Sequence, residues 1–188
     1  MNESSPVTLL AEGRFLRLVR RGRWEYAVRT QASGAVVLVA VTEEGKLLLV
    51  EQYRVPVGRP TLELPAGVAG DTAGAPDEAL AAAAERELRE ETGYTAHAFE
   101  PLLTGPSGPG MVSEMVTFFR ARGLTRVSAG GGEAGEGITV HEVPLTSLAG
   151  WLAAQQRAGV LVDPKIYVGL YFLGMAPGAA PGGLAAAP

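Results

Sequence analysis

The sequence predicts an α/β protein in which a mixed sheet is sandwiched between helices and one central helix carries a cluster of carboxylates. Residues 36–41 and 47–50 are almost continuously apolar, which is typical of strands buried on both faces, and such strands need helices to cover them. Residues 77–92 have a helical pattern, because alanine dominates the first half, Pro76 suits the first turn and Gly93 ends the helix. The mixed order of strands and helices then favours an α/β sandwich.

Composition excludes several classes of function. The 188 residues suffice for one domain with a buried core. Sixteen basic and 20 acidic residues give a net charge of −4, and a nucleic-acid partner normally requires a strongly basic face. The absence of cysteine excludes disulfides, thiolate metal sites and a thiol nucleophile. With only two histidines, His97 and His141, any bound metal should be a hard cation held by carboxylates.

The chain carries no recognisable targeting segment. Residues 1–6 lack the basic start and apolar stretch of a signal peptide. No apolar run approaches the ~18 residues that a membrane span needs. We therefore expect a cytoplasmic protein that does not engage a membrane.

Three regions are expected along the chain. Residues 1–34 should hold short strands with a turn at Arg21-Gly22, and residues 35–175 should form the main domain. Residues 176–188 consist of Pro, Gly, Ala and one Leu, which predicts a disordered tail.

Local patterns predict the elements of the main domain. The apolar runs at 36–41 and 47–50 flank a turn at Glu43–Gly45, which predicts a β-hairpin. Further strands are expected at 62–64, 114–121 and 138–143. Residues 129–137 are glycine-rich and predict a mobile loop. Two helices should follow, one over residues 147–158 and one that Asp163 caps with Pro164 behind it.

The predicted helix gathers acidic side chains near its C-terminal end. At ~100° per residue, Glu87, Glu90 and Glu91 fall within an arc of about 100°. The neighbouring arc, which should face the core, holds Ala81, Ala84 and Leu88. Three carboxylates there repel one another and face the negative end of the helix dipole. Divalent cations would make the cluster favourable; ion pairs with Arg86 and Arg89 on a solvated face are the alternative.

With the preceding Leu64-Pro65-Ala66-Gly67, this helix resembles the Nudix box. The matching residues are Glu78, Arg86, Glu87, Leu88, Glu90, Glu91, Gly93 and Tyr94. One departure is a five-residue insertion, since ten residues instead of five separate Gly67 from Glu78. The resemblance implies the Nudix fold, with Mg²⁺ (or Mn²⁺) held by Glu87, Glu90, Glu91 and the Ala66 carbonyl, and with Arg86 orienting the glutamates.

Over residues 12–173 the chain looks most like the ADP-ribose pyrophosphatases. Three segments carry this likeness, at residues 50–54, 62–67 and 108–114. Motifs of the NADH and coenzyme A branches are missing. The likeness implies substrate contacts from Arg54, Glu63, Trp24, Met111 and Glu114. It also implies a loop glutamate as the base that takes a proton from water; Glu136 is the first choice, Glu133 the second and the box residue Glu90 the alternative.

The N-terminal region is open to two interpretations. Its arginines stand at positions 14, 17, 20, 21 and 23, and they suit either a solvated strand edge or, by the resemblance, strands exchanged across a homodimer. Trp24 and Tyr26 suit either packing within the sheet or stacking on adenine.

The expected function is metal-dependent hydrolysis of ADP-ribose to AMP and ribose 5-phosphate, so the partner is a nucleoside diphosphate sugar. Hydrolysis of another nucleotide sugar, such as GDP-mannose, is the first alternative. A non-catalytic domain that senses ADP-ribose is the second, although such domains usually lose the box glutamates that this chain keeps.

Overall fold

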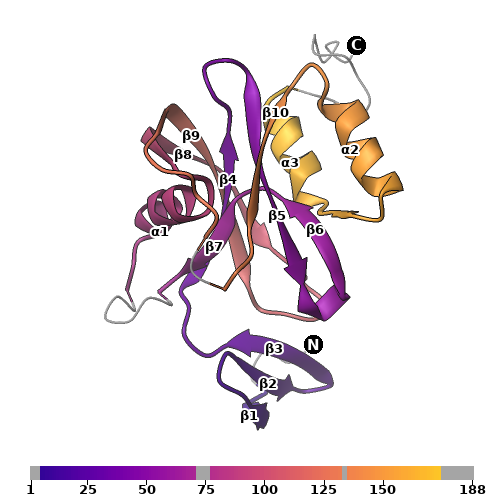
Figure 1. The fold of residues 1–188 in the computed structure, drawn as a ribbon. Helices are drawn as coiled ribbons and strands as arrows, with labels where there is room; N and C mark the ends of the chain where they lie inside the picture. The colour runs from indigo at the N-terminus through magenta and orange to yellow at the C-terminus, as the bar shows by residue number, and fades with distance from the viewer. Residues whose placement is uncertain (1–4, 71–76, 133–134, 175–188) are drawn as a thin grey trace, which may run out of the picture.

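The computed structural model describes residues 5–70, 77–132 and 135–174, and its strands form three sheets (Figure 1). The N-terminal sheet is antiparallel in the order β1-β2-β3, with β1 at Val7–Glu12, β2 at Leu16–Arg21 and β3 at Trp24–Arg29. Gly22, at φ 60°, makes the turn between β2 and β3. Figure 1 shows this sheet below the rest of the molecule.

The two remaining sheets are both mixed. The first has the order β7-β4-β9-β8, in which β4 (Gly34–Ala40) runs parallel to β9 (Met115–Arg126) and antiparallel to β7 (Ala66–Ala69). Its edge strand β8 (Tyr94–Pro106) pairs antiparallel with β9. The second sheet has the order β10-β5-β6-β11. Its strands are β10 (Thr139–Pro144), β5 (Lys46–Arg54), β6 (Arg59–Glu63) and β11 (Leu161–Val162), and the short 3₁₀ turn η1 (Val55–Val57) joins β5 to β6.

The predicted β-hairpin between residues 36–41 and 47–50 is wrong. The turn is present, with Gly45 at φ 74°, but β4 and β5 enter different sheets and share one bridge, Val41 to Leu47. The reason is that β7 and β9 occupy the two edges of β4. The inference that β4 is buried on both faces is confirmed, because Val37 and Val39 enter one core and Val36 and Leu38 the other.

Helices cover both sides of these sheets, which confirms the α/β sandwich (Figure 1). Helix α1 (Leu80–Glu87) packs Ala83 and Ala84, and the next residue, Leu88, packs with them, in the core that includes residues of β4 and β9. On the other side, α2 (Leu148–Arg157) and α3 (Lys165–Phe172) pack against a second apolar core. As predicted, the Asp163 carboxylate accepts a hydrogen bond from the Lys165 amide at 2.7 Å, which caps α3.

The carboxylate helix differs from its prediction at both ends. It begins at Leu80 rather than at residue 77, and Ala81 is exposed while Ala83 takes the expected core position. Its last five residues, Leu88–Thr92, form a π-helical turn, η2. Such widened turns often occur at functional sites, and this one carries Glu90 and Glu91.

Other features lay beyond the prediction. The long edge strand β8 was not expected, since residues 94–106 mix apolar, polar and turn-forming types without clear alternation. The predicted tail at 176–188 lies outside the described residues. Among the described helices, none is long and apolar enough to cross a membrane.

Candidate active site

Arg86 stands at the centre of the candidate site. Its guanidinium donates hydrogen bonds to both carboxylate oxygens of Glu78, each at 3.1 Å, and to the Val68 carbonyl at 3.0 Å. It also donates to Glu87 at 2.8 Å and to Glu90 at 3.2 Å. These bonds lower the pKa of Glu78 and raise that of Arg86 further above its ordinary value. Glu78 thus keeps its place in the box despite the insertion before it.

Strand β7 provides the space in which Glu87 lies. A Cβ atom at Gly67 would stand 1.9 Å from the carboxyl carbon of Glu87, so no larger residue fits without displacing this carboxylate. Glu87 is only 9% exposed. The glycine of the box is therefore required for close contact with a charged side chain.

Glu91 is the most deeply buried carboxylate of the predicted cluster. It is 6% exposed and accepts a hydrogen bond from the Ala66 amide at 2.9 Å. Burial raises its pKa to about 8, and the nearby charges of Glu87 and Glu136 add to the rise. Without a cation, this carboxyl therefore holds its proton at neutral pH.

The predicted metal ligands lie near one another, but their side chains are not arranged to coordinate a metal ion. In the part of the chain described, no three acidic or histidine side chains converge closely enough to hold a metal as they stand. Arg86 engages Glu87 and Glu90, and Ala66 contacts Glu91 through its amide rather than its carbonyl. The donors still suit a hard divalent cation, since carboxylate and carbonyl oxygens are its preferred ligands and mutual repulsion already raises the pKa of Glu91.

The glycine-rich segment after β9 is docked on the end of this helix. The Gly131 amide donates to the Glu91 carbonyl at 2.8 Å, and the Gly132 amide donates to the Glu90 carbonyl at 2.9 Å. Glu136 follows in the same loop, close enough to Glu91 for its charge to raise the pKa of Glu91. The predicted base thus lies within electrostatic range of Glu91, whereas Glu133 is outside the described residues. Within the loop that the sequence predicts to be mobile, Gly131 and Gly132 are therefore hydrogen-bonded to the end of the helix.

Arg54 and Glu63 form an ion pair on adjacent strands. The Arg54 guanidinium donates two hydrogen bonds to the Glu63 carboxylate, at 2.6 and 2.7 Å. Glu63 is 5% exposed, and the pair raises the pKa of Arg54. The charges of Glu91 and Asp163 also reach Arg54, so this pair borders the carboxylate site.

The predicted substrate contacts near the N-terminal sheet come together at a second place. The loop before β9 binds β3, because the Ala27 amide donates to the Met111 carbonyl at 2.9 Å and the Ser113 amide donates to the Ala27 carbonyl at 3.1 Å. Glu114 accepts a hydrogen bond from Arg29. Trp24 lines a cavity of about 320 Å³ with Tyr26 and residues of this loop. The Met111 side chain is 75% exposed and does not line it.

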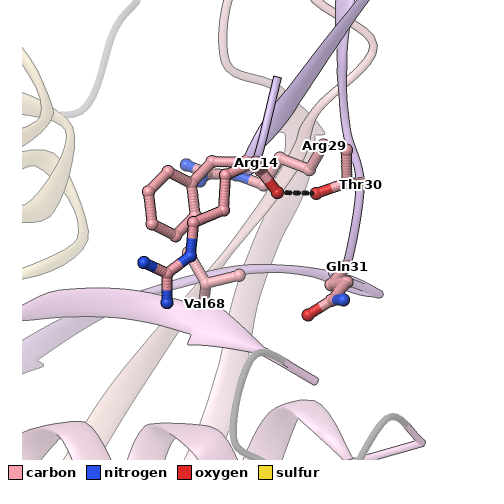
Figure 2. Close-up of a pocket in the computed structure, with 6 residues that line it drawn as sticks. Arg14, Arg29, Thr30, Gln31 and Val68 are labelled. Atoms are coloured by element: carbon pink, nitrogen blue, oxygen red, sulfur yellow. Dashed lines mark hydrogen bonds between the residues drawn. The ribbon is translucent and has the colours of Figure 1, made fainter. Parts of the chain in front are cut away.

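A further cavity lies between the N-terminal sheet and β7 (Figure 2). Its volume is about 370 Å³, and the side chains around it are Arg14, Phe15, Arg29, Thr30, Gln31 and Val68. The Arg14 guanidinium lies over the Phe15 ring, 4.9 Å from its centre. The Thr30 hydroxyl donates to the Arg14 carbonyl at 2.8 Å, as Figure 2 shows.

Sequence reasoning passed over Phe15 and Arg29. It treated Arg14 only as part of a basic stretch. These residues meet because β2 pairs with β3 so that Leu16 stands opposite Arg29. No spacing along the chain signals this cavity; only the strand register creates it.

Comparisons with known proteins agree with this geometry. The ADP-ribose pyrophosphatase of Bacillus subtilis (strain 168) is 40% identical over 92 residues, which cover 49% of this chain and 47% of that protein. The methanol dehydrogenase activator of Bacillus methanolicus is 30% identical over 141 residues, or 74% of this chain and 71% of the activator. A GDP-mannose pyrophosphatase of Citrobacter koseri (strain ATCC BAA-895 / CDC 4225-83 / SGSC4696) is 31% identical over 156 residues, or 80% and 78% of the two chains.

The fold and the sequence profile point the same way. A crystal structure titled as an ADP compounds hydrolase has the same fold, with a TM-score of 0.67, 22% identity and 89% of each chain covered. The sequence profile of the NUDIX domain matches residues 31–160, well over half of the chain. This chain therefore belongs to the Nudix hydrolase family.

Proposed function

We propose that the protein hydrolyses the pyrophosphate bond of ADP-ribose and releases AMP and ribose 5-phosphate in the cytoplasm. One observation carries the proposal. The backbone of Val68 binds the arginine of the carboxylate cluster, while its side chain lines the cavity that holds Arg14 and Arg29. A single residue thus joins a cation-suited acidic site to a cavity suited to phosphates.

A divalent cation bound here, Mg²⁺ or Mn²⁺, would neutralise the phosphates and make a water molecule more acidic. Glu87, Glu91 and Glu90, with the Ala66 carbonyl, would hold it. Glu90 and Glu87 must then turn away from Arg86, which keeps its bonds to Glu78 and Val68. Arg86 thereby fixes the end of the helix while its glutamates bind.

Glu136 is the proposed general base. It belongs to a loop that is hydrogen-bonded to the backbone carbonyls of Glu90 and Glu91, and the residue is exposed to solvent. From there it takes the proton of the attacking water and gives it up to solvent after the bond is broken.

The substrate's nucleotide half would lie toward the N-terminal sheet. Arg14 and Arg29 offer guanidinium groups to the phosphates. Phe15 and Trp24, both exposed aromatic residues, offer flat faces for adenine. Arg54, held by Glu63, borders the carboxylates and would orient one of the two phosphates.

A homodimer through residues 7–30 is part of this proposal. The N-terminal region exposes several large apolar side chains: Val7, Leu9, Leu10, Phe15, Leu16, Leu18 and Trp24. Exposed apolar surface of this extent often marks an interface. A second copy of the sheet would cover them and border the same cavities.

The alternative substrate is GDP-mannose. The long alignment with a GDP-mannose pyrophosphatase favours it, because that alignment covers 80% of this chain, against 49% for the ADP-ribose pyrophosphatase of B. subtilis. Both substrates present two phosphates to the same cluster, so the base and the sugar decide between them.

A panel of ADP-ribose, GDP-mannose and other nucleotide sugars tests the proposal, with products separated by ion-exchange chromatography. We expect AMP and ribose 5-phosphate from ADP-ribose, at a kcat/KM well above that for the other compounds. The Glu91→Gln variant, purified in parallel, controls for contaminating hydrolases. Faster release of GMP from GDP-mannose would identify GDP-mannose as the substrate instead. Tight binding of ADP-ribose without turnover would indicate a sensor domain rather than an enzyme.

A further inference from the structure

The docked glycine segment, Gly130–Gly132, binds the backbone of the same residues that carry the catalytic carboxylates. The last carbonyls of a helix have no partner within the helix. Here the Gly131 and Gly132 amides supply partners to the Glu91 and Glu90 carbonyls, at 2.8 and 2.9 Å. The end of the carboxylate helix and the start of the Glu136 loop are therefore held together directly, backbone to backbone.

This contact is too close for side chains. A Cβ at Gly130 would stand 2.3 Å from the Thr92 carbonyl carbon, and one at Gly93 would stand 2.3 Å from the Ser128 carbonyl oxygen. The Val127 and Ser128 amides also donate to the Gly93 carbonyl, at 2.8 and 3.1 Å. Because backbone atoms cannot move aside singly, glycine is required on both surfaces.

Gly132 connects this fixed segment to Glu136. A Cβ at Gly132 would stand 2.2 Å from Oε2 of Glu136 and 2.8 Å from Cδ1 of Ile138. The Glu136 carboxylate thus rests on the Cα of Gly132, while the amide of Gly132 is bound to the Glu90 carbonyl. Gly132 therefore contacts both the Glu136 carboxylate and the helix that carries Glu90 and Glu91.

We propose that Gly132 is a positioning residue, which acts through Glu136 by leaving the space in which the Glu136 carboxylate comes to rest. This rests on the proposed function, because it takes Glu136 as the base. An alanine at position 132 would displace the free end of a flexible side chain rather than backbone. The substitution should therefore move the carboxylate without unfolding the protein.

Gly137 is a matched control within the same loop. Both glycines have positive φ angles, 73° at Gly132 and 64° at Gly137, so alanine suffers similar backbone strain at either position. A Cβ at Gly137 meets nothing within 4 Å, however. Only the alanine at position 132 therefore collides with Glu136 and Ile138.

The experiment compares Gly132→Ala and Gly137→Ala in steady-state hydrolysis of ADP-ribose, with thermal unfolding and Mn²⁺ binding measured on each. Misplacement of a reacting group by about 1 Å can cost ~10²-fold in rate. We expect Gly132→Ala to lower kcat by about 10²-fold with KM and Mn²⁺ affinity unchanged. Gly137→Ala should keep a kcat within about threefold of the wild-type value, because the added Cβ does not contact the Glu136 carboxylate. Equal kcat values for the two variants would overturn the inference.

A double-mutant cycle shows whether Gly132 acts through Glu136. If it does, Gly132→Ala should cause no further loss of kcat in the Glu136→Gln background, since residues that act as a unit are non-additive. A full additional loss in that background would mean a structural role and would overturn the inference. The base assignment fails separately, if Glu136→Gln alone keeps the wild-type kcat.

Discussion

The Cα of Gly67 lies directly against the carboxylate of Glu87, so closely that an added Cβ would stand 1.9 Å from the Glu87 carboxyl carbon and from one of its oxygens. Glycine is required here for space alone, because Gly67 has no positive φ angle. Strand β7 and helix α1 can therefore pack this closely only because residue 67 has no side chain.

Gly67→Ala should therefore impair the site more than the fold. We expect kcat to fall at least ~10-fold, because the methyl group pushes Glu87 out of its place and misorients a metal ligand. The melting temperature should also fall by several degrees, as overpacking costs about 1–3 kcal/mol. Gly150→Ala is the control: it lies in helix α2 with open space around it, and alanine there should raise the melting temperature slightly. A Gly67→Ala variant with normal kcat would contradict the assignment of Glu87.

Glu91 should make the stability of the metal-free protein fall as the pH rises. Its pKa is about 8 in the folded chain against an ordinary value of 4.5, so between these values the folded protein binds a proton that the unfolded chain releases. The contribution is fully present below pH 4.5 and is lost by about pH 8. At about 1.4 kcal/mol per pKa unit, a rise of about 3.5 units corresponds to a loss on the order of 5 kcal/mol.

Thermal unfolding in EDTA from pH 5 to 9 measures this effect. The wild type should lose more stability over the range than Glu91→Gln, which cannot titrate, and the difference isolates Glu91 from other groups. Saturating Mg²⁺ should restore the wild type at pH 8, because the cation binds the ionised carboxylate. Parallel curves for the two proteins in EDTA would show that Glu91 does not hold a proton.

Glu87→Gln and Glu91→Gln should each lower kcat by at least ~10²-fold without unfolding the protein. The physical reason is that ligands of a catalytic cation act mainly on the transition state. Kinetics at saturating Mg²⁺, with circular dichroism as the check on folding, measure the effect. Near-normal turnover in either variant would remove that residue from the metal site.

Arg14→Ala should raise the KM for ADP-ribose by at least about tenfold, because a charge-assisted bond to phosphate contributes roughly 1.5–3 kcal/mol. Arg17→Ala is the matched control, since Arg17 belongs to the same basic stretch but pairs with Glu12 on the surface and lines none of the cavities described above. Steady-state kinetics with both variants measure the difference. Equal KM values would indicate that the cavity in Figure 2 does not receive the phosphates.

The protein should sediment as a dimer of twice 19.5 kDa at micromolar concentration. Leu9→Glu and Leu16→Glu place charges at exposed apolar positions of the N-terminal sheet, where a dimer would bury them. Both should shift the equilibrium toward monomer. A wild-type protein that sediments as a monomer would count directly against residues 7–30 as an interface.

How far the sequence predicts this molecule depends on the range of each interaction. The carboxylate helix, its end at Gly93 and the cap of α3 by Asp163 follow from neighbours a few residues apart, and these predictions agree with the structure within a few residues. The strands that pair with β4 do not follow from near neighbours. Two strands linked by a short turn usually pair with each other, and only the whole set of strands shows that β7 and β9 pair with the two edges of β4.

The same limit applies to the site. The acidic cluster can be predicted from the sequence because residues 86–94 match this part of the box without a gap. The docking of Gly130–Gly132 depends on backbone hydrogen bonds between residues 40 and 42 positions apart in the chain, and Phe15 and Arg29 meet through strand register. Neither leaves a local pattern in the sequence.

The parallel pairing of β4 with β9 has a consequence for synthesis of the protein. Val36 stands opposite Thr117, so 117 − 36 = 81 further residues must be translated before this strand meets its partner. Until then a nascent chain exposes a strand that is apolar on both faces and has one open edge, which favours association with other chains. Translation products that stop before Met115 should therefore aggregate, even though they contain the whole Nudix box.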